Sequence, residues 1–427
     1  MARWLYTLLF YLITPLILLR LAYRASKAPA YRQRLAERFG LFSTEGFKQP
    51  LKDCIWVHAV SVGETIAAAP MVKKLQQQYP TTPIVVTTMT PTGSERVRAL
   101  FGDEVFHVYA PYDLPGPIKR FLQRLRPKLL VIMETELWPN TIHYCHKNAI
   151  PVVVANARLS AKSAAGYQRF AALIQPMLTK VSTIVAQSQA DADRFLSLGL
   201  PPTQLIISGS IKFDVEISAE LQNHAAQLKQ QWSQQDTRLI ILASSTHEGE
   251  DEIILNAFKQ LLAHAPNTLL TLVPRHPERF DKVAGLIQQS GLSCQRRSIS
   301  DTPSASTQVY LGDTMGELLL LYGCANIAIV GGSFIPSGGH NMLEPAAWGL
   351  AIITGESDFN FAAASALLQQ QNALIKTTDA DSLFAALNTL SHSATQRQTM
   401  GTAAVNAVAA NRGALARLMA VLNQYLP

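Results

Sequence analysis

The chain has 427 residues, of which 48% are hydrophobic and 16% are charged, so it contains enough apolar material for two or three packed domains. This composition excludes an intrinsically disordered chain. The four cysteines, Cys54, Cys145, Cys294 and Cys324, match no zinc-site spacing and no disulfide framework, which favours a reducing compartment.

The formal net charge of +7 is concentrated near the N-terminus. Arg3 and the segment from Arg20 to Arg38 supply most of the excess, and Glu37 is the single acidic residue of that segment. Its cations are Arg20, Arg24, Lys27, Arg32, Arg34 and Arg38. Because the remaining chain is nearly balanced, the charge does not indicate a nucleic-acid-binding face.

An uncharged, mostly apolar run from Trp4 to Leu19 opens the chain, and Leu21–Tyr23 extends it. A spanning helix needs about 17–25 residues. The basic residues follow the run, whereas those of a cleaved signal peptide precede it. Under the positive-inside rule, this pattern predicts a membrane anchor over residues 1–23, a basic juxtamembrane segment over 24–52 and a cytoplasmic body. A buried core helix is the alternative, and a spanning and a monotopic anchor both remain open.

Short apolar runs separated by helical stretches then predict an N-terminal domain over residues 53–214. The expected strands are Ile55–Ala59, Ile84–Thr88, Val105–Ala110, Leu129–Glu134, Val152–Ala155, Thr183–Ala186 and Leu205–Ser208. Helices are expected at Ala67–Gln78 and Ile118–Leu125. Most of the strands are continuously apolar, which is typical of parallel strands covered on both faces. The fold class is therefore α/β, with a doubly wound sheet.

Residues 215–236 are polar and glutamine-rich, and we interpret them as a linker to a second α/β domain over 237–427. The strands expected there are Leu239–Ala243, Leu269–Val273, Gln308–Leu311, Ile327–Val330, Ala351–Thr354 and Ala373–Lys376. The alanine-rich tail from Ala385 to Leu426 is predicted to be helical, and its last helix could pack on the N-terminal domain. We expect the ligand site in the cleft between the domains, at the carboxyl ends of the strands.

Glu64 follows the first strand, where catalytic groups of this architecture gather. However, Ser61-x-x-Glu64 is also a capping box, in which the glutamate only satisfies backbone donors. The same pattern recurs at Thr314-x-x-Glu317, Asn341-x-x-Glu344 and Ser245-x-x-Glu248. Both interpretations of Glu64 stay open from spacing alone.

Glu134 and Glu136 follow the fourth strand in Met133–Asn140. Two carboxylates in this position are costly to bury unless they face a solvated cleft or a partner, so the pair either caps a loop or serves a site. Lys212 lies at the domain junction, where it could reach a bound phosphate or be a solvated linker residue.

A glycine-rich stretch, Val330–Pro345, follows the strand Ile327–Val330 and leads to Asn341-x-x-Glu344. Glycine allows a close backbone approach, and a helix start offers free N–H groups to an anion. The stretch therefore predicts a site for a phosphate or a phosphate-bearing sugar donor. Arg275 and Arg279 follow another strand and could pair with phosphate or carboxylate.

The motifs of common nucleotide and metal sites are absent from the sequence. There is no G-x-x-x-x-G-K-[ST] and no G-x-G-x-x-G after a strand, and Asp191-Ala192-Asp193 is interpreted as a helix start. No cofactor and no metal are predicted, so leaving-group charge must be met by Lys, Arg and helix N-termini.

Several motifs, in this order along the chain, together resemble one known family. They are Ser61-Val62-Gly63-Glu64, Thr87–Gly93, Met133–Asn140, Ala155–Ser160, Lys212-Phe213-Asp214, Pro274–Phe280 and Gly338–Glu344. The chain resembles the 3-deoxy-D-manno-octulosonic acid (Kdo) transferases, membrane-associated enzymes that put Kdo on lipid A in Gram-negative bacteria. The resemblance covers nearly the whole chain.

This resemblance implies a GT-B fold, in which two Rossmann-like domains face a central cleft, and an inverting, metal-independent transfer of Kdo from CMP-Kdo to a lipid A precursor such as lipid IVA. It implies that Glu64 is the general base and that Glu134 and Lys212 support the transition state. It places CMP contacts on Pro274, Arg275, Met315, Gly316, Glu317, Asn341, Met342, Leu343 and Glu344. It also implies the cytoplasmic side of the inner membrane, with anionic lipids beside the basic segment. The alternatives are another GT-B enzyme acting on a UDP-sugar, such as an epimerase or lipid glycosyltransferase, and a non-catalytic sugar-nucleotide-binding module.

Overall fold

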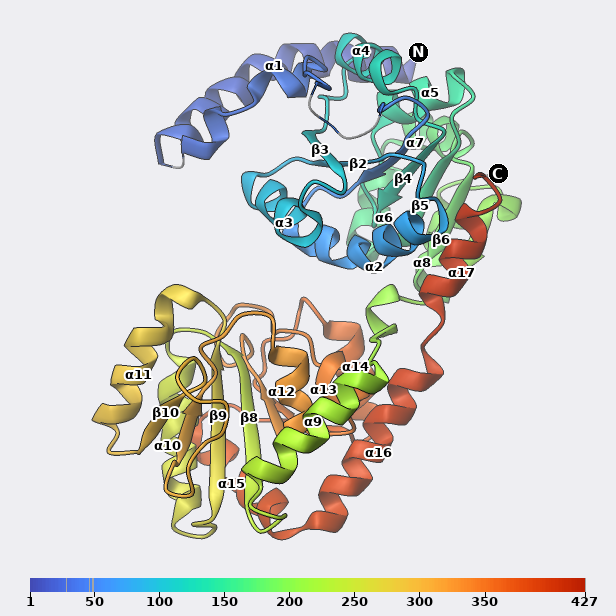
Figure 1. Ribbon diagram of the computed structural model, residues 1–427. Helices are drawn as coiled ribbons and strands as arrows, with labels where there is room; N and C mark the ends of the chain where they lie inside the picture. Colours follow the sequence, from blue (N-terminus) through green and yellow to red (C-terminus); the bar gives the residue numbers. More distant parts are fainter. Residues whose placement is uncertain (28, 46, 48–49, 427) are drawn as a thin grey trace. The chain divides into compact units, whose positions relative to one another are not determined.

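The computed structural model describes residues 1–27, 29–45, 47 and 50–426, which divide into two compact units (Figure 1). The first unit comprises Met1–Asp214 together with the chain from Arg412 onward, and the second comprises Val215–Asn411. Residues 28, 46, 48 and 49 of the predicted juxtamembrane segment, the Lys27 side chain and residue 427 lie outside the described part of the chain.

The first unit is built on a parallel sheet in the order β3-β2-β1-β4-β5-β6-β7. Its strands are β1 (Ile55–His58), β2 (Ile84–Thr88), β3 (Phe106–Tyr109), β4 (Leu129–Met133), β5 (Val152–Ala157), β6 (Thr183–Ala186) and β7 (Leu205–Ile207). Alternate side chains fill two cores, with Trp56 and Leu130 on one face and Val57 and Val131 on the other. Burial on both faces explains why the strands are continuously apolar.

Helices cover both faces of this sheet. They are α1 (Ala2–Lys27), α2 (Val62–Gln78), α3 (Pro91–Phe101), α4 (Pro115–Leu125), α5 (Pro139–Lys147), α6 (Ala161–Gln168), α7 (Ala171–Leu178), α8 (Gln189–Ser197) and α17 (Ala414–Leu422). The helix start predicted near Asp191 is confirmed, because Ser188 caps α8 and accepts the Asp191 N–H.

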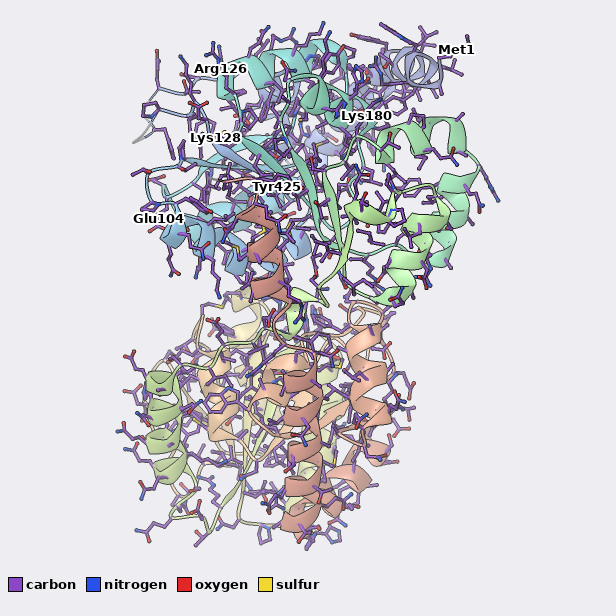
Figure 2. The ribbon with its side chains drawn as sticks, turned by 90° about the vertical axis from the view of Figure 1, so that its right-hand side faces the viewer. Met1, Glu104, Arg126, Lys128, Lys180 and Tyr425 are labelled. Carbon is purple, nitrogen blue, oxygen red and sulfur yellow. The ribbon has the colours of Figure 1, made fainter. Side chains whose placement is uncertain are left out.

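The last helix belongs to the first unit. The sequence prediction assigned residues 237–427 to the second domain but allowed the last helix to pack on the N-terminal domain, as it does. Leu415, Leu418 and Leu422 of α17 are buried in the same core as α2. The Tyr425 side chain, just beyond α17, hydrogen-bonds Thr183 at 2.8 Å (Figure 2). The apolar face of α17 is therefore covered by the first sheet's core.

The second unit has its own parallel sheet in the order β10-β11-β9-β8-β12-β13-β14. Its strands are β8 (Leu239–Thr246), β9 (Thr268–Pro274), β10 (Cys294–Arg296), β11 (Val309–Leu311), β12 (Ile327–Val330), β13 (Ala351–Thr354) and β14 (Leu374–Lys376). Its helices are α9 (Ala219–Trp232), α10 (Glu250–Leu262), α11 (Phe280–Gln289), α12 (Leu318–Cys324), α13 (Leu343–Ala347), α14 (Ala362–Gln370), α15 (Ala380–His392) and α16 (Ala394–Ala410).

The segment predicted as a linker is largely occupied by α9. Ala225, Leu228 and Trp232 of α9 are buried in a core that also contains α12 residues such as Leu321. The glutamine-rich composition concealed this apolar stripe, since polar residues fill the rest of the helix surface.

Among the described residues, one helix is long and apolar enough to cross a membrane, and it is the N-terminal helix α1. Trp4, Leu8 and Leu12 are among the large apolar side chains that it exposes. Its first turns are nevertheless fastened to the first unit, because Arg3 Nη1 donates to Asn140 Oδ1 at 2.8 Å and the Tyr6 hydroxyl donates to Asp113 Oδ2 at 2.9 Å.

Two cations of the predicted basic segment are held inside the first unit. Arg38 is buried, donates to the Met89 carbonyl at 3.0 Å and stacks over the Tyr109 ring. Arg34 pairs with Glu37 and donates to the His107 carbonyl at 2.8 Å. These two arginines therefore hold the segment against β3 and do not contribute freely exposed charge.

Candidate active site

Three residues predicted from sequence lie along one edge of the first sheet. Glu64 is in the first turn of α2, which follows β1, and Glu134 directly follows β4. Lys212 lies in the short 3-10 helix η4 (Ile211–Phe213), whose Ile211 N–H donates to Asn156 Oδ1 of β5 at 3.2 Å. Because β1, β4 and β5 are adjacent and parallel, their carboxyl ends share one edge. The fold thus brings Glu64, Glu134 and Lys212 to the same side of the unit.

The Glu64 carboxylate is buried and held by two hydrogen bonds. Oε2 accepts the Val60 N–H at 2.8 Å, and Oε1 accepts the Ser61 hydroxyl at 2.8 Å. Burial raises the pKa of Glu64 above its usual 4.5, these bonds lower it, and the charge of Glu134 raises it further. A fixed carboxylate with a raised pKa can accept a proton from a nearby hydroxyl.

Of the four predicted patterns, Ser61-x-x-Glu64 is the one at a helix start, and it is half a capping box, because the Glu64 side chain accepts the Val60 N–H and not that of Ser61. Ser61 caps α2 and accepts the Glu64 N–H at 3.3 Å. The other three predicted patterns are not capping boxes, because α10, α12 and α13 begin at Glu250, Leu318 and Leu343. The pattern of a polar residue followed three positions later by Glu therefore occurs in tight loops as well as at helix starts.

The backbone at this edge is strained at two non-glycine positions. Glu134 has φ +56° and Asn156 has φ +52°, both in the left-handed region that side chains disfavour. The β5–β6 register also shifts between Val154 and Ala157. Strained backbone and bulges gather at functional sites, which supports a functional interpretation of this edge.

Glu136 completes a cluster of three coupled carboxyl groups. Burial first, and then the charges of Glu64 and Glu134, raise the pKa of Glu136 to about 7. At neutral pH this group is therefore partly protonated beside Glu64. The spacing of Glu134 and Glu136 alone fits a capped loop as well as a site.

We expect the Glu136→Gln variant to differ from wild type in how its stability depends on pH. Since the folded-state pKa is raised, the stabilisation is present below about pH 4.5 and is lost as the pH rises through about 7. Wild type should therefore lose about 1–2 kcal/mol relative to Glu136→Gln across this window, allowing for solvent screening of the partly exposed group. Urea unfolding of both proteins at several pH values measures the difference, and parallel curves would contradict the shifted pKa.

In the second unit, Arg275 directly follows β9 and lies near two histidines, His247 and His340. His247 Nε2 and His340 Nε2 are 2.8 Å apart and their rings stack. Burial, followed by the charges of His247 and Arg275, lowers the pKa of His340 to about 4. Burial also lowers the pKa of His247. A guanidinium and two neutral imidazoles form a site that can bind an anion.

The glycine-rich loop after β12 does not offer its N–H groups to a ligand as the sequence predicted. The buried Glu250 carboxylate accepts the N–H groups of Gly332, Ser333 and Phe334 at 2.7, 2.9 and 2.9 Å. It also accepts the His247 N–H at 2.8 Å. The anion held by these backbone donors is therefore the protein's own side chain.

Close packing, and not a bound ligand, explains why residue 331 of this loop is a glycine. A Cβ at Gly331 would lie 2.7 Å from the carbonyl oxygens of Ser244 and Ser245. Gly339 N–H donates to the Gly332 carbonyl, and His340 N–H donates to the Gly331 carbonyl. The two glycine pairs thus fasten the loop to itself and place His340 beside His247.

The other residues predicted to contact CMP differ in what they can present. Asn341 Nδ2 donates to Glu344 Oε1 at 3.0 Å, and burial raises the pKa of Glu344. Met342 and Leu343 are buried, so a ligand could meet their backbone but not their side chains. Glu317 is bound by Arg297 at 2.9 Å. Met315 is exposed and Gly316 has φ +88°.

Arg279 is not a ligand-binding arginine in this arrangement, although the sequence allowed that role. Its guanidinium pairs with the buried Asp251 and donates to the Thr246 carbonyl at 2.7 Å. Pro274 ends β9 and sets the turn from which Arg275 projects. The charges of both arginines act on His247, and that of Arg275 acts on His340 as well.

Sequence reasoning missed His247 and Glu250. Both follow β8 in the run His247-Glu248-Gly249-Glu250, and their position after a strand was the available signal. All four cysteines are free, and no group of three His, Cys, Asp or Glu residues is placed to hold a metal within the ranges that the structure describes.

Comparisons with known proteins agree with these features. A family model described as 3-deoxy-D-manno-octulosonic-acid transferase (kdotransferase) matches residues 33–215. The chain is 48% identical to a 3-deoxy-D-manno-octulosonic acid transferase of Haemophilus influenzae, over 100% of this chain and 99% of that protein. It is 36% identical to the transferase of the same name from Bordetella pertussis, over the full length of both.

Among solved structures, a glycosyltransferase from Rickettsia africae aligns with a TM-score of 0.55 at 15% identity, over 88% of this chain and 98% of that chain. This likeness concerns the fold, and it confirms the prediction of a GT-B protein with two doubly wound α/β units. With the two full-length relatives, it leads to one conclusion: the chain belongs to the 3-deoxy-D-manno-octulosonic acid transferase family.

Proposed function

We propose that the protein transfers Kdo from CMP-Kdo to a hydroxyl of a lipid A precursor such as lipid IVA, with inversion at the anomeric carbon. The buried Glu64 carboxylate carries the proposal, because its orientation is fixed and its pKa is raised at a sheet edge shared with Glu134 and Lys212. These are the properties of a general base.

In this mechanism Glu64 removes the proton from the acceptor hydroxyl. The hydroxyl oxygen then attacks the anomeric carbon of Kdo from the face opposite the phosphate, and the bond from that carbon to the phosphate oxygen breaks. CMP leaves with the bonding electrons, and the proton remains on Glu64. Lys212 and Glu134 stabilise the transition state, in which charge develops on the sugar.

The donor site is proposed for the second unit. Arg275, next to the neutral His247–His340 pair, would meet the phosphate of CMP, and Glu344 would accept a hydrogen bond from the ribose. Met315, Gly316 and the backbone of Asn341–Leu343 would complete the cytidylate contacts. Arg275 would then supply the positive charge that favours departure of CMP, without a metal ion.

Helix α1 is proposed to attach the enzyme to the cytoplasmic face of the inner membrane. It exposes an apolar surface, yet Arg3, Tyr6 and Thr7 bond the folded unit. A helix fastened in this way suits a position in the membrane interface better than one across the bilayer. The cations that follow it, such as Arg20 and Arg24, would lie close to anionic lipid headgroups.

Incubation of the protein with CMP-Kdo and lipid IVA, followed by mass analysis of the lipid, tests this function. The expected product is heavier than lipid IVA by one or more Kdo residues and forms together with CMP. A protein stabilised by UDP but not by CMP in a thermal-shift titration, and inactive with CMP-Kdo, would contradict the proposal in favour of a UDP-sugar enzyme.

A further inference from the structure

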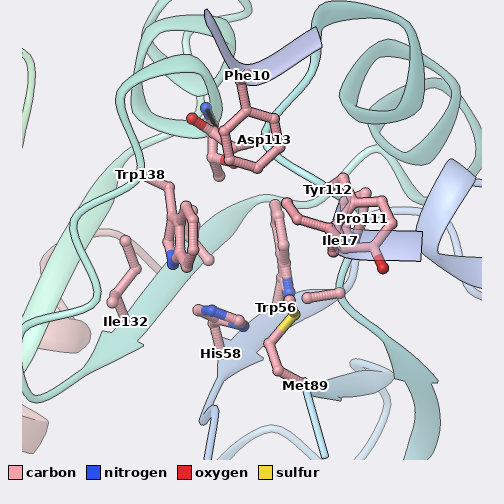
Figure 3. Close-up of a pocket in the computed structure, with 13 residues that line it drawn as sticks. Phe10, Ile17, Trp56, His58, Met89, Pro111, Tyr112, Asp113, Ile132 and Trp138 are labelled. Carbon is pink, nitrogen blue, oxygen red and sulfur yellow. Dashed lines mark hydrogen bonds between the residues drawn. The ribbon is translucent and has the colours of Figure 1, made fainter. Parts of the chain in front are cut away.

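The first unit contains an apolar cavity between α1 and the carboxyl ends of β1 to β4 (Figure 3). Its volume is about 180 Å³. Its lining includes Phe10, Ile17, Trp56, Met89, Ile132 and Trp138. This is comparable to the roughly 150 Å³ of an apolar cavity that binds benzene, which is room for part of a hydrocarbon chain.

Asp113 and His58 of the lining are hydrogen-bonded within the protein, whereas the buried Trp138 indole N–H makes no hydrogen bond within the described residues. Asp113 accepts the Tyr6 hydroxyl, the Asn140 N–H, and both the N–H and the hydroxyl of Thr141. His58 bonds Thr87 at 2.9 Å, and burial lowers its pKa to about 4, so it is neutral. A sugar or nucleotide would lose hydrogen bonds in such a cavity, whereas a hydrocarbon would lose none.

Helix α1, which is proposed to attach the protein to the membrane, covers one side of the cavity. Phe10 and Ile17 line the cavity, while Leu9, Leu12 and Leu16 of the same helix are exposed (Figure 3). Helix α1 therefore has one apolar side toward the surroundings and another over the cavity. A hydrocarbon chain leaving the membrane interface beside α1 would find a continuous apolar surface.

Two residues of the cavity lining, His58 and Trp138, are close in sequence to the candidate base and its neighbouring carboxyl groups. His58 ends β1, which is followed by the turn that carries Glu64, and Trp138 lies in the same loop as Glu134 and Glu136. The charges of Glu64 and Glu134 both act on Glu136. The cavity and the three carboxyl groups thus share the loops that follow β1 and β4.

We propose that this cavity binds part of one acyl chain of the lipid acceptor and thereby holds the acceptor headgroup beside Glu64. The assignment rests on the proposed function and adds to it that the acceptor is recognised partly through its hydrocarbon. The acceptor, and not a bilayer phospholipid, is the assigned occupant because the cavity shares its loops with the catalytic carboxyl groups.

A terminally brominated dodecanoate tests chain binding, because bromine quenches tryptophan fluorescence on contact. The experiment uses the Trp4→Phe variant, which lacks the exposed tryptophan of α1 and keeps Trp56 and Trp138 in the cavity lining. Saturable quenching is expected below the micelle concentration, with about fourfold weaker binding for each methylene removed from the probe. Quenching that rises linearly without saturation would overturn the proposal.

Two neighbouring substitutions on α1 provide a matched pair. Ile17→Phe fills the cavity and should weaken dodecanoate binding about tenfold or more, whereas Leu16→Phe enlarges an exposed side chain and should leave binding unchanged. The KM for an acylated acceptor should rise in Ile17→Phe only, and the KM for CMP-Kdo should not change. Equal probe affinities in the two variants would overturn the proposal.

An assay of Kdo transfer by the wild-type protein distinguishes a failure of the cavity assignment from a failure of the proposed function. No product from CMP-Kdo and lipid IVA would refute the function itself. An active protein whose acceptor KM is the same in Ile17→Phe and Leu16→Phe would refute only the cavity assignment. If Ile17→Phe loses dodecanoate binding while its acceptor KM is unchanged, the cavity holds a bilayer lipid and the proposal fails.

Discussion

Replacing Glu64 by glutamine is expected to lower the rate of Kdo transfer about 10²–10⁴-fold, because the amide cannot accept a proton from the acceptor hydroxyl. The side-chain oxygen of glutamine can still accept the Val60 N–H, so the turn into α2 should persist. The fall is expected in kcat, with little change in the KM for CMP-Kdo, because the proposed donor contacts lie in the second unit. Steady-state kinetics with CMP-Kdo and lipid IVA measure both constants.

The pH profile distinguishes a base from a residue that only shapes the loop. Wild-type activity should rise with pH through the pKa of Glu64, which burial sets above its usual 4.5. Glu64→Gln should lack this acidic limb. Glu95→Gln is a matched control, since Glu95 is an exposed carboxylate on α3 of the same unit. Full activity of Glu64→Gln, or an unchanged acidic limb, would contradict the assignment of Glu64 as the base.

The two α/β sheets could be predicted from sequence because their strands are buried on both faces. The run Ile327–Val330 is continuously apolar and Ile84–Thr88 is apolar up to two buried threonines, and the structure has strands with the same bounds. Strand β10 was missed, since Cys294–Arg296 is an edge strand of mixed polarity and only partly buried. An edge strand faces solvent along one side and needs no apolar run.

The candidate site could be predicted only as far as chain position after a strand indicates function. Glu64, Glu134 and Arg275 directly follow strands or the turns after them, and the fold places each at a sheet edge. The interaction between His247 and His340 joins residues 93 positions apart, which no local pattern in one sequence reveals. The same holds for Asp113, whose partners Tyr6 and Thr141 come from α1 and α5.

The glycine-rich loop shows why a local motif can be misinterpreted. Four glycines after a strand predicted backbone donors for a ligand phosphate, but Glu250 occupies three of these donors. A carboxylate and a phosphate satisfy the same N–H groups, so the loop geometry alone does not identify the anion. The first part of the loop, Gly332 to Phe334, therefore binds Glu250, and only its later part, from Asn341 to Glu344, stays in the proposed nucleotide site.

Replacing Glu250 by glutamine is accordingly expected to destabilise the second unit by about 2–4 kcal/mol, although Glu250 is not proposed to touch the nucleotide. The glutamine oxygen can replace one carboxylate oxygen, but its NH₂ group is a donor that meets backbone donors. Two buried N–H groups would lose their acceptor, and each loss costs about 1–3 kcal/mol. Urea unfolding monitored by circular dichroism measures the change.

The companion variant Glu252→Gln separates this effect from a general loss of negative charge at the start of α10. Glu252 lies in the same first turn but is exposed, so its replacement should change the free energy of unfolding by less than about 0.5 kcal/mol. Glu250→Gln should also weaken CMP binding, because the loop that it releases carries His340 and leads into Asn341. Equal unfolding midpoints for the two variants would contradict the structural role of Glu250. Normal stability combined with lost CMP binding would instead place the Glu250 carboxylate in direct contact with the nucleotide.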